Sequence, residues 1–331
     1  MVREIIENDF EEIALFLSEF SDQRFSKEKY LNDFNFWWKD NPSFKDDTFG
    51  WIIEDGSQGN TIKGFLGNIP VEYELDKSNI MTYNATTWYV HPDYKKEASY
   101  LAMAFFTQGK DFLLNSTPSK FTEKIFLKLG CKDYAATQQS YIKIESVSSI
   151  YNFISKKIKN KLISSTISFV IFYFIMFTRL LTLRKDDFEL KVVDNIDMFK
   201  RKENKLYIKN LNWILLDNDK KVFSISNKKE QGYIITQFIY NKVNGMRYIQ
   251  VLDFDISLKT LDSVTDSIIS YYRKDVDFIL ISNYNMNKRF SSNFINITSV
   301  LRPICLVKSE RSINNKIITS IFGEKGFILW K

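Results

Sequence analysis

A basic turn that follows a predicted strand is the part of the sequence best suited to chemistry. Residues 87–95 have the sequence Thr-Trp-Tyr-Val-His-Pro-Asp-Tyr-Lys, and a helical pattern begins directly after them. The N–H groups that open a helix, aided by the helix dipole, bind anions such as phosphate. Lys95 and Lys96 add positive charge at this point. The pattern predicts a site for a phosphate-bearing ligand, and the alternative is a solvated basic turn.

Three side chains near this turn are the candidates for catalysis. His91 is the only histidine, and a histidine side chain titrates near neutral pH. Its alternative role is that of a turn residue. Glu72, on the preceding predicted strand, could accept a proton through a water molecule. Thr87 contributes a hydroxyl on the strand before the turn, although a hydroxyl is not a base.

The composition excludes several kinds of site and partner. The chain has 46 Lys and Arg against 40 Asp and Glu, a formal charge of +6. This mild excess suits a phosphate-bearing cofactor or an anionic membrane surface, and no nucleic-acid partner is expected. Cys131 and Cys305 lie far apart, so no metal site and no disulfide framework are expected. Because the first residues lack the apolar core of a secretion signal, we expect a cytoplasmic chain, free or at the inner face of the cell membrane.

The hydrophobic pattern predicts an α/β fold. The expected order is helices at 10–17 and 27–38, strands at 50–54, 62–73 and 79–90, a helix at 97–112, a strand at 112–115 and a helix at 118–129. The turns between the middle strands are short, so these strands are expected to be antiparallel. Trp37 and Trp38 end the second helix, where they could stack on a sugar ring or pack in the core.

An uncharged run, Leu162 to Phe177, lies between basic residues. Lysines at 156, 157, 159 and 161 precede it, and Arg179, Arg184 and Lys185 follow. A spanning helix needs about 20 apolar residues, which makes this run short. Three readings remain open: a helix packed between domains, a peripheral membrane contact through residues 156–185, and a true span.

The second half of the chain partly repeats the first. Five landmarks recur in the same order: 51–53 at 213–215, 64–65 at 232–233, 88–90 at 249–252, the following helix at 258–272, and 111–115 at 277–281. This pattern predicts a duplicated fold, with domains at 1–145 and 188–331 and a helical connector at 146–187. Two unrelated α/β domains that share an order by chance are the alternative.

Two stretches carry a resemblance to a known family. The turn at 87–95 resembles the strand-to-helix turn of GNAT-type acyltransferases, and Ile125–Cys131 resembles their closing helix, which ends in Leu-Gly-Phe. Together they cover about residues 50–135. Gly64–Pro70 makes the chain most similar to members from bacterial surface-polysaccharide gene clusters. The resemblance implies tandem GNAT-like domains, each a mixed, mostly antiparallel sheet flanked by helices.

The resemblance also implies a set of site residues. In this family, the strand before the turn separates from its neighbour and binds the pantetheine of acetyl-CoA or another acyl-CoA. The residues expected to bind the cofactor are Trp88, Tyr89, Val90, Lys95, Lys96, Glu97, Ala98, Ser99, Tyr100, Leu101, Ser119 and Phe126. The residues expected on the acceptor side are Trp38, Asn68 and Asn115. Ala98 and Tyr100 replace small residues of the family's glycine-rich loop, and Phe126 replaces a tyrosine that protonates the leaving thiolate.

The second half lacks the basic turn. Leu252–Ile256 includes Asp253 and Asp255, which would repel a pyrophosphate, so a structural or acceptor-binding role is expected there. Arg302-Pro303 and Gly323-Glu324 are candidate polar contacts. The function implied is transfer of an acetyl or other short acyl group from CoA to an amine of a sugar or sugar nucleotide. A non-catalytic binding module and a Fem-type aminoacyl-tRNA-dependent transferase are the alternatives.

Overall fold

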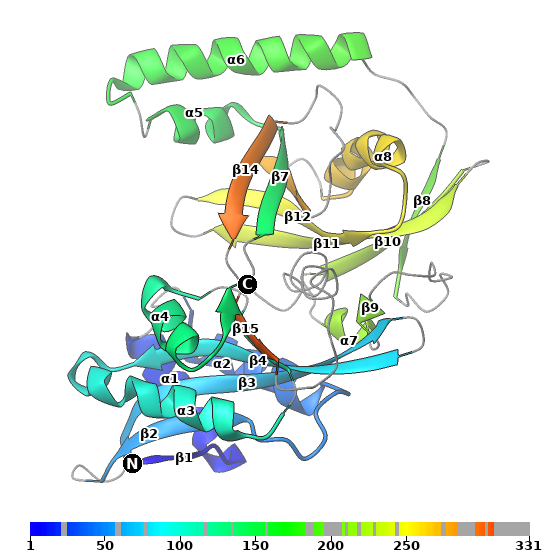
Figure 1. The fold of residues 1–331 in the computed structure, drawn as a ribbon. Coiled ribbons are helices and arrows are strands. Elements are labelled where there is room, and N and C mark those ends of the chain that lie inside the picture. Colours follow the sequence, from blue (N-terminus) through cyan, green and yellow to red (C-terminus); the bar gives the residue numbers. More distant parts are fainter. Residues whose placement is uncertain are drawn as a thin grey trace. The chain divides into compact units, whose positions relative to one another are not determined.

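A computed structural model of the chain shows two sheets, each flanked by helices (Figure 1). It describes residues 1–20, 25–56, 61–75, 78–110, 112–115, 118–133, 136–155, 158–182, 188–194, 207–208, 211–216, 220–227, 230–241, 245–272, 276–283, 295–301 and 304–307. Lys156, Lys157, Arg184, Lys185 and the candidate contacts at 302–303 and 323–324 lie outside these residues. The chain forms two compact units, residues 1–136, 202–213 and 301–322 in one, and 137–201, 214–300 and 323–331 in the other.

The first unit is built on one mixed sheet. Its strands lie in the order β1 (Val2–Glu4), β2 (Gly50–Asp55), β3 (Thr61–Leu75), β4 (Ser78–Val90), β5 (Phe112–Asn115), β15 (Ile304–Val307) and β6 (Lys132–Asp133), and β9 (Tyr207–Ile208) pairs with β3. Pairing is antiparallel except between β4 and β5, which are parallel. A parallel pair needs a crossover, and the helix between β4 and β5 supplies it.

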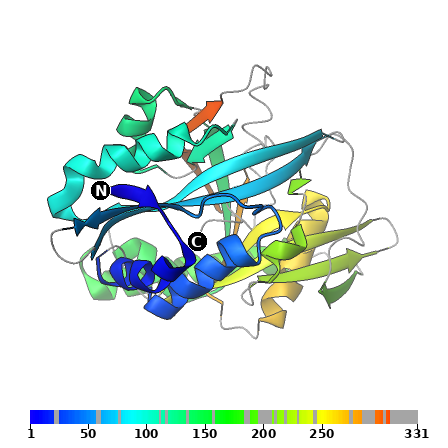
Figure 2. The same cartoon turned by 90° about the horizontal axis from the view of Figure 1, so that it is seen from below.

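Helices cover both faces of this sheet (Figure 2). They are η1 (Glu7–Asp9), α1 (Phe10–Phe20), α2 (Lys27–Phe34), the π-helical turn η2 (Asn35–Lys39), η4 (Pro92–Glu97), α3 (Ala98–Thr107), α4 (Lys120–Lys128) and the short α7 (Leu211–Ile214). One face packs on α3 and α4 through a core that includes Trp51, Leu101 and Phe126. The other face packs on α1 and α2, where the Phe34 ring lies 6.0 Å from that of Phe65.

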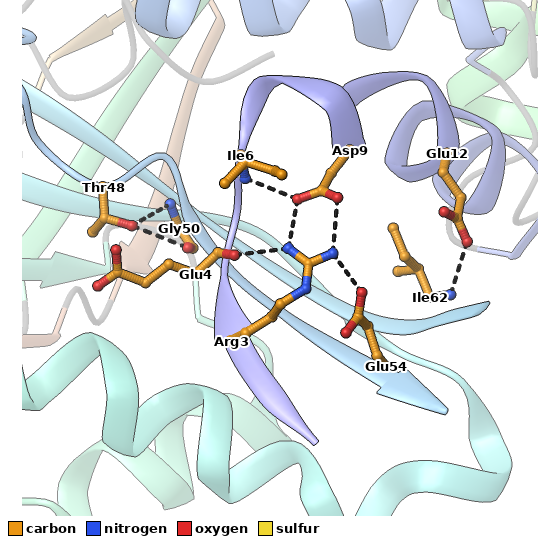
Figure 3. Close-up of polar contacts among 9 residues, drawn as sticks. All are labelled: Arg3, Glu4, Ile6, Asp9, Glu12, Thr48, Gly50, Glu54 and Ile62. Atoms are coloured by element: carbon orange, nitrogen blue, oxygen red, sulfur yellow. Dashed lines mark hydrogen bonds and ion pairs between the residues drawn. The ribbon is translucent and has the colours of Figure 1, made fainter. Parts of the chain in front are cut away.

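An arginine fixes the edge of the first sheet (Figure 3). Arg3 on β1 donates hydrogen bonds of 2.7 and 2.8 Å to both carboxylate oxygens of Asp9, and it also pairs with Glu54 on β2. Asp9 in turn accepts the Ile6 N–H at 2.8 Å. A bidentate arginine–carboxylate pair holds a defined geometry. It therefore ties β1, β2 and the start of α1 together.

The second unit repeats the architecture. Its strands lie in the order β8 (Glu189–Val193), β10 (Lys220–Ser226), β11 (Gln231–Asn241), β12 (Met246–Phe254), β13 (Phe278–Asn283), β7 (Ala136–Ile144) and β14 (Ile295–Leu301). Its helices are α5 (Val147–Ser155), α6 (Lys161–Thr182) and α8 (Leu258–Tyr271). The strands β12 and β13 are parallel and joined through α8, as β4 and β5 are joined through α3.

The two sheets share more than strand order. In each, the strand before the crossover helix carries one extra residue near its end: Thr87 and Trp88 of β4 stand opposite Leu66, and Leu252 of β12 is unpaired between Val251 and Asp253. A β-bulge at the same place in both sheets is a regular part of this architecture and not a local defect. The predicted α/β fold, with two mixed, mostly antiparallel sheets flanked by helices, is confirmed.

One landmark of the repeat is wrong. Trp213 lies in α7, not in a strand, and its indole Nε1 donates a 2.7 Å hydrogen bond to the Phe36 carbonyl oxygen. The counterpart of β2 is β10. Each sheet also receives a strand from the other half of the sequence, since β7 pairs with β13 and β15 pairs with β5. The predicted boundaries at 145 and 187 stay a prediction.

Candidate functional site

The parallel pair β4–β5 opens after two residues. Among the residues that the structure describes, β4 pairs with β5 only at Tyr83, opposite Leu113, and at Asn84, opposite Leu114. β4 continues to Val90, so residues 85–90 extend past the pairing with β5. The described residues of β5 do not pair with this stretch, and a strand edge of this kind can bind an extended ligand by strand addition.

The bulge lies on this free stretch of β4. Phe65 pairs with Tyr89 and Gly67 pairs with Thr86, so two residues of β4 face one of β3. Thr87 adopts a positive φ of 47°. The left-handed region is unfavourable for a β-branched residue, and such strain persists where the surroundings impose it. Strained backbone at an open strand end is typical of a functional site.

Gly67 makes room for the bulge. A Cβ at this position would lie 2.7 Å from the Thr86 methyl carbon and 3.0 Å from the Phe65 ring. Thr86 is buried, and its hydroxyl lies 3.3 Å from that of Thr87. The two threonines and the glycine therefore fix the local path of β4.

The turn after β4 is a 3₁₀ helix, η4, rather than a glycine-rich loop. The Tyr94 hydroxyl anchors it by donating a 2.6 Å hydrogen bond to Asp55, and this bond raises the pKa of Tyr94 to about 12. Ala98 and Leu101 are buried in the core, whereas Lys95, Lys96 and Ser99 are exposed. Tyr100 is 61% exposed, so its ring points away from the core and does not close the turn.

The start of α3 lacks a side-chain cap. Glu97 occupies the N-cap position without a capping hydrogen bond, and its Oε2 is buried with no hydrogen-bond partner in the described part of the chain. The positive end of a helix dipole without a cap favours an anion. Lys95 and Lys96 stand within three residues of this end.

The corresponding helix of the second unit, α8, is capped by side chains of the same unit. At the start of α8, the Ser257 hydroxyl accepts the Thr260 N–H at 3.3 Å. The Glu230 carboxylate accepts hydrogen bonds from the Ser257 N–H, from the Ser257 hydroxyl at 2.9 Å and from the Thr260 hydroxyl. A carboxylate of the chain itself therefore takes the place of an anion at this helix end.

The structure does not bring the three catalytic candidates together. Thr87 lies at the bulge. Glu72 pairs with Met81, six residues along β3 from Leu66, which corresponds to about 20 Å. His91 accepts the Asp93 N–H at 3.4 Å through Nδ1, and its ring lies 5.3 Å from that of Phe20. His91 therefore has the local contacts of a turn residue.

Two predicted cofactor contacts, Phe126 and Ser119, lie in α4 and at its N-cap position. Phe126 is buried, and its ring meets that of Trp88 edge-on at 5.3 Å, which joins α4 to the free stretch of β4. A phenylalanine cannot donate a proton, so this position supplies no acid. Ser119 caps α4 by accepting the Thr122 N–H at 3.2 Å.

The predicted acceptor residues are mostly inside the unit. Trp38 is 1% exposed, and its Nε1 donates a 2.9 Å hydrogen bond to the Asn68 carbonyl oxygen. Its ring has no free face for a sugar, which contradicts the predicted acceptor contact. Asn68 is fully buried and donates to the Thr48 carbonyl oxygen at 3.1 Å. Asn115 ends β5 opposite Ile304.

Sequence analysis missed two features of this region. Asn84, at the last β4–β5 pair, is buried and donates to the Ile69 carbonyl oxygen at 3.1 Å. The bulge at Thr87 also went unseen, because one extra residue in a strand leaves no distinctive local pattern. The glycine opposite, Gly67, was its only sequence signal.

No family model and no curated protein matches this sequence. Solved structures match both halves together. A probable N-acyltransferase of Enterococcus faecalis V583 matches with a TM-score of 0.57 at 9% identity, covering 93% of this chain and 72% of its own. A GCN5-related N-acetyltransferase of Anabaena variabilis matches at 0.52 and 11% identity, covering 93% and 72%. Saccharomyces cerevisiae N-myristoyltransferase with bound myristoyl-CoA matches at 0.54 and 11%, covering 92% and 82%.

The chain has a tandem GNAT fold. At these identities the likeness shows the fold alone, and it spans nearly the whole chain. The open β4–β5 pair and the uncapped α3 lie in the first GNAT unit, and the capped α8 lies in the second.

Proposed function

We propose that the chain is an acyl-CoA-dependent N-acyltransferase whose first unit binds CoA. The observation that carries this proposal is the free stretch of β4, which leaves β5 after Asn84 and leads to the start of α3. Pantetheine, with its two amides, suits an open strand edge. The diphosphate suits an uncapped helix N-terminus with Lys95 and Lys96 beside it.

The contrast between the units supports binding in the first only. In the second unit, Glu230 occupies the start of α8, Asp253 lies near the end of the preceding strand, and Asp255 follows that strand. A diphosphate brought there would meet the Glu230 carboxylate, and like charges at close range repel. One CoA per chain follows from this difference.

The residues at the bulge suit catalysis by positioning. Thr86, Thr87 and Trp88 carry no group that titrates near neutral pH, so the acceptor amine must arrive uncharged. Its nitrogen forms a bond to the thioester carbon, the C–S bond breaks, and the amine proton leaves to solvent or to the departing thiolate. A bulge leaves a backbone N–H outside the strand ladder, and such a donor can stabilise the oxyanion.

We propose an amino group of a sugar or sugar nucleotide as the acceptor. Support for this step is the resemblance of Gly64–Pro70 and of the Trp-Tyr-Val strand end to acyltransferases from surface-polysaccharide gene clusters. A panel of amino sugars and peptides, assayed for thiol release from acetyl-CoA, tests it. Acylation of peptides alone would refute the sugar acceptor and leave CoA binding intact.

CoA binding itself is tested by calorimetry with acetyl-CoA and CoA. The double variant K95E/K96E should lose affinity at least tenfold, because charge reversal acts on the diphosphate. The control K124E/K128E makes the same change of charge on the exposed side of α4. Equal losses in both variants, or no binding by the wild-type chain at millimolar CoA, would refute the proposal. Binding without thiol release from any amine acceptor would instead support the non-catalytic module.

A further inference from the structure

The second unit carries a helix with two different apolar faces. α6 lies on α5, on the side away from the sheet (Figure 1). Its inner face packs through Phe172 and Ile175 on a cluster that contains Ile142, Ile144 and Ile150. Ser164 and Ser168 on the same side are fully buried, and these small side chains allow α6 to approach α5 closely.

The opposite side of α6 is apolar and exposed. We call it the outer face; it comprises Leu162, Ile163, Phe169, Val170, Tyr173, Phe174 and Phe177, all of which are exposed. Leu162 is 78% exposed, Phe174 67% and Tyr173 65%. At 3.6 residues per turn these positions fall on one side of the helix, together with the exposed Thr166 between Ile163 and Phe169, so they form one stripe. Large contiguous apolar patches are rare on monomers and mark interaction surfaces.

The charge around this stripe has one sign. Between residues 146 and 185 the sequence has no Asp or Glu, and its seven Lys and Arg flank the apolar run. Lys159 and Lys161 are exposed at the N-terminal end of α6. Cations at a helix N-terminus oppose the helix dipole, so these lysines do not stabilise the helix. Their placement fits an anionic surface outside the protein.

We propose that the outer face of α6 docks on an anionic lipid surface, with the helix lying in the plane of the membrane interface. An apolar stripe with aromatic residues and basic flanks is the composition of interfacial helices. Of the helices that the structure describes, none combines the length and the apolar character needed to span a membrane. Docking through this face does not depend on acyl transfer.

Charge also argues against a second copy of α6 as the occupant. In a parallel pair, the lysines at 159 and 161 would meet their own counterparts. In an antiparallel pair, they would lie near the end of α6 that carries Arg179. Both arrangements place like charges together, whereas anionic lipid neutralises them.

Vesicle flotation with the full chain tests the proposal. We expect binding to vesicles with about one third phosphatidylglycerol and weak binding to phosphatidylcholine alone. K159E/K161E should weaken binding by about fivefold or more for each lysine, and added salt should also weaken the binding of the wild-type chain. Y173E/F174E should abolish binding. The control F121E/L127E changes exposed apolar residues of α4 in the same way and should bind normally.

Three results would overturn the proposal. These are equal binding by Y173E/F174E and the wild-type chain, absence of binding to anionic vesicles, and a dimer in light scattering that Y173E/F174E converts to monomer. Unchanged thermal stability and CoA affinity of the variants show that they fold. Because those readouts are separate, failure of membrane docking leaves the proposed acyl transfer untouched.

Discussion

The strained backbone at Thr87 predicts an unusual response to glycine. In most strands, Thr→Gly is destabilising, because glycine loses more entropy on folding and fits a strand poorly. At Thr87, φ is 47°, a region that glycine adopts without strain. Thr87→Gly should therefore relieve about 1–2 kcal/mol of backbone strain.

The opposing costs can be worked from the same contacts. Glycine entropy costs about 0.5–1 kcal/mol. Loss of the 3.3 Å hydroxyl contact with Thr86 costs about 0.5–1 kcal/mol. The net change in unfolding free energy at Thr87 should be close to zero. Thr86→Gly is the matched control, since it carries the same costs without relief and also loses the methyl group packed on Gly67. It should destabilise by about 2 kcal/mol.

Thermal unfolding of the two variants checks this difference. About 2 kcal/mol in a unit of some 150 residues corresponds to roughly 4–8 °C in Tm. We expect Thr87→Gly to melt within about 2 °C of the wild-type chain and Thr86→Gly to melt lower by that margin. Equal losses at the two positions would show that the bulge stores no strain. Thr87→Asn, which tolerates positive φ, should behave like the glycine variant.

Three further predictions concern charge and burial. Burial alone would raise the pKa of Asp9, but hydrogen bonds from Arg3 and a backbone N–H lower it below its usual value. The Arg3–Asp9 pair therefore stabilises the fold fully above about pH 4, and this stabilisation is lost as the pH falls through the folded-state pKa of Asp9. In urea unfolding, the free energy of unfolding of Asp9→Asn should fall less steeply with decreasing pH than that of the wild-type chain. Glu230→Gln should cost about 1 kcal/mol by the same assay, because α8 loses its carboxylate cap, and a variant as stable as wild type would contradict this. Burial raises the pKa of Cys131 to about 12, so in a Cys305→Ser background a thiol reagent at about pH 8 should react only after unfolding.

The sequence predicted those parts of the fold that have local patterns. The strands that became β3, β4 and β12, and the helices that became α4 and α8, follow periodicity and stop signals that short windows contain. The insertion of β15 beside β5 has no such signal, because it joins residues 304–307 to 112–115. Pairing between distant segments is decided by tertiary packing.

The candidate site shows the same division. The position of the turn after β4 followed from His91-Pro92, but its 3₁₀ geometry and the exposure of Tyr100 depend on packing beneath it. Trp38 shows that a residue type alone can mislead. A tryptophan suits a sugar site and a core equally well, and the stacked ring of Phe34, 5.0 Å away, decides for the core.

The two units share the bulge but differ at the start of the crossover helix, so comparing them shows which features the fold itself needs. Both sheets keep the bulge before the crossover helix, although only Thr87 among the two bulges has a positive φ. A shared bulge therefore belongs to the fold. The two helix ends differ instead in their caps, because Ser257 and Glu230 make capping hydrogen bonds at the start of α8, whereas Glu97 at the N-cap of α3 makes none. A helix end whose N–H groups are already capped by side chains gains little from a diphosphate, whereas an end without a side-chain cap gains more. The asymmetry between α3 and α8 is thus the feature on which the proposed CoA site in the first unit rests.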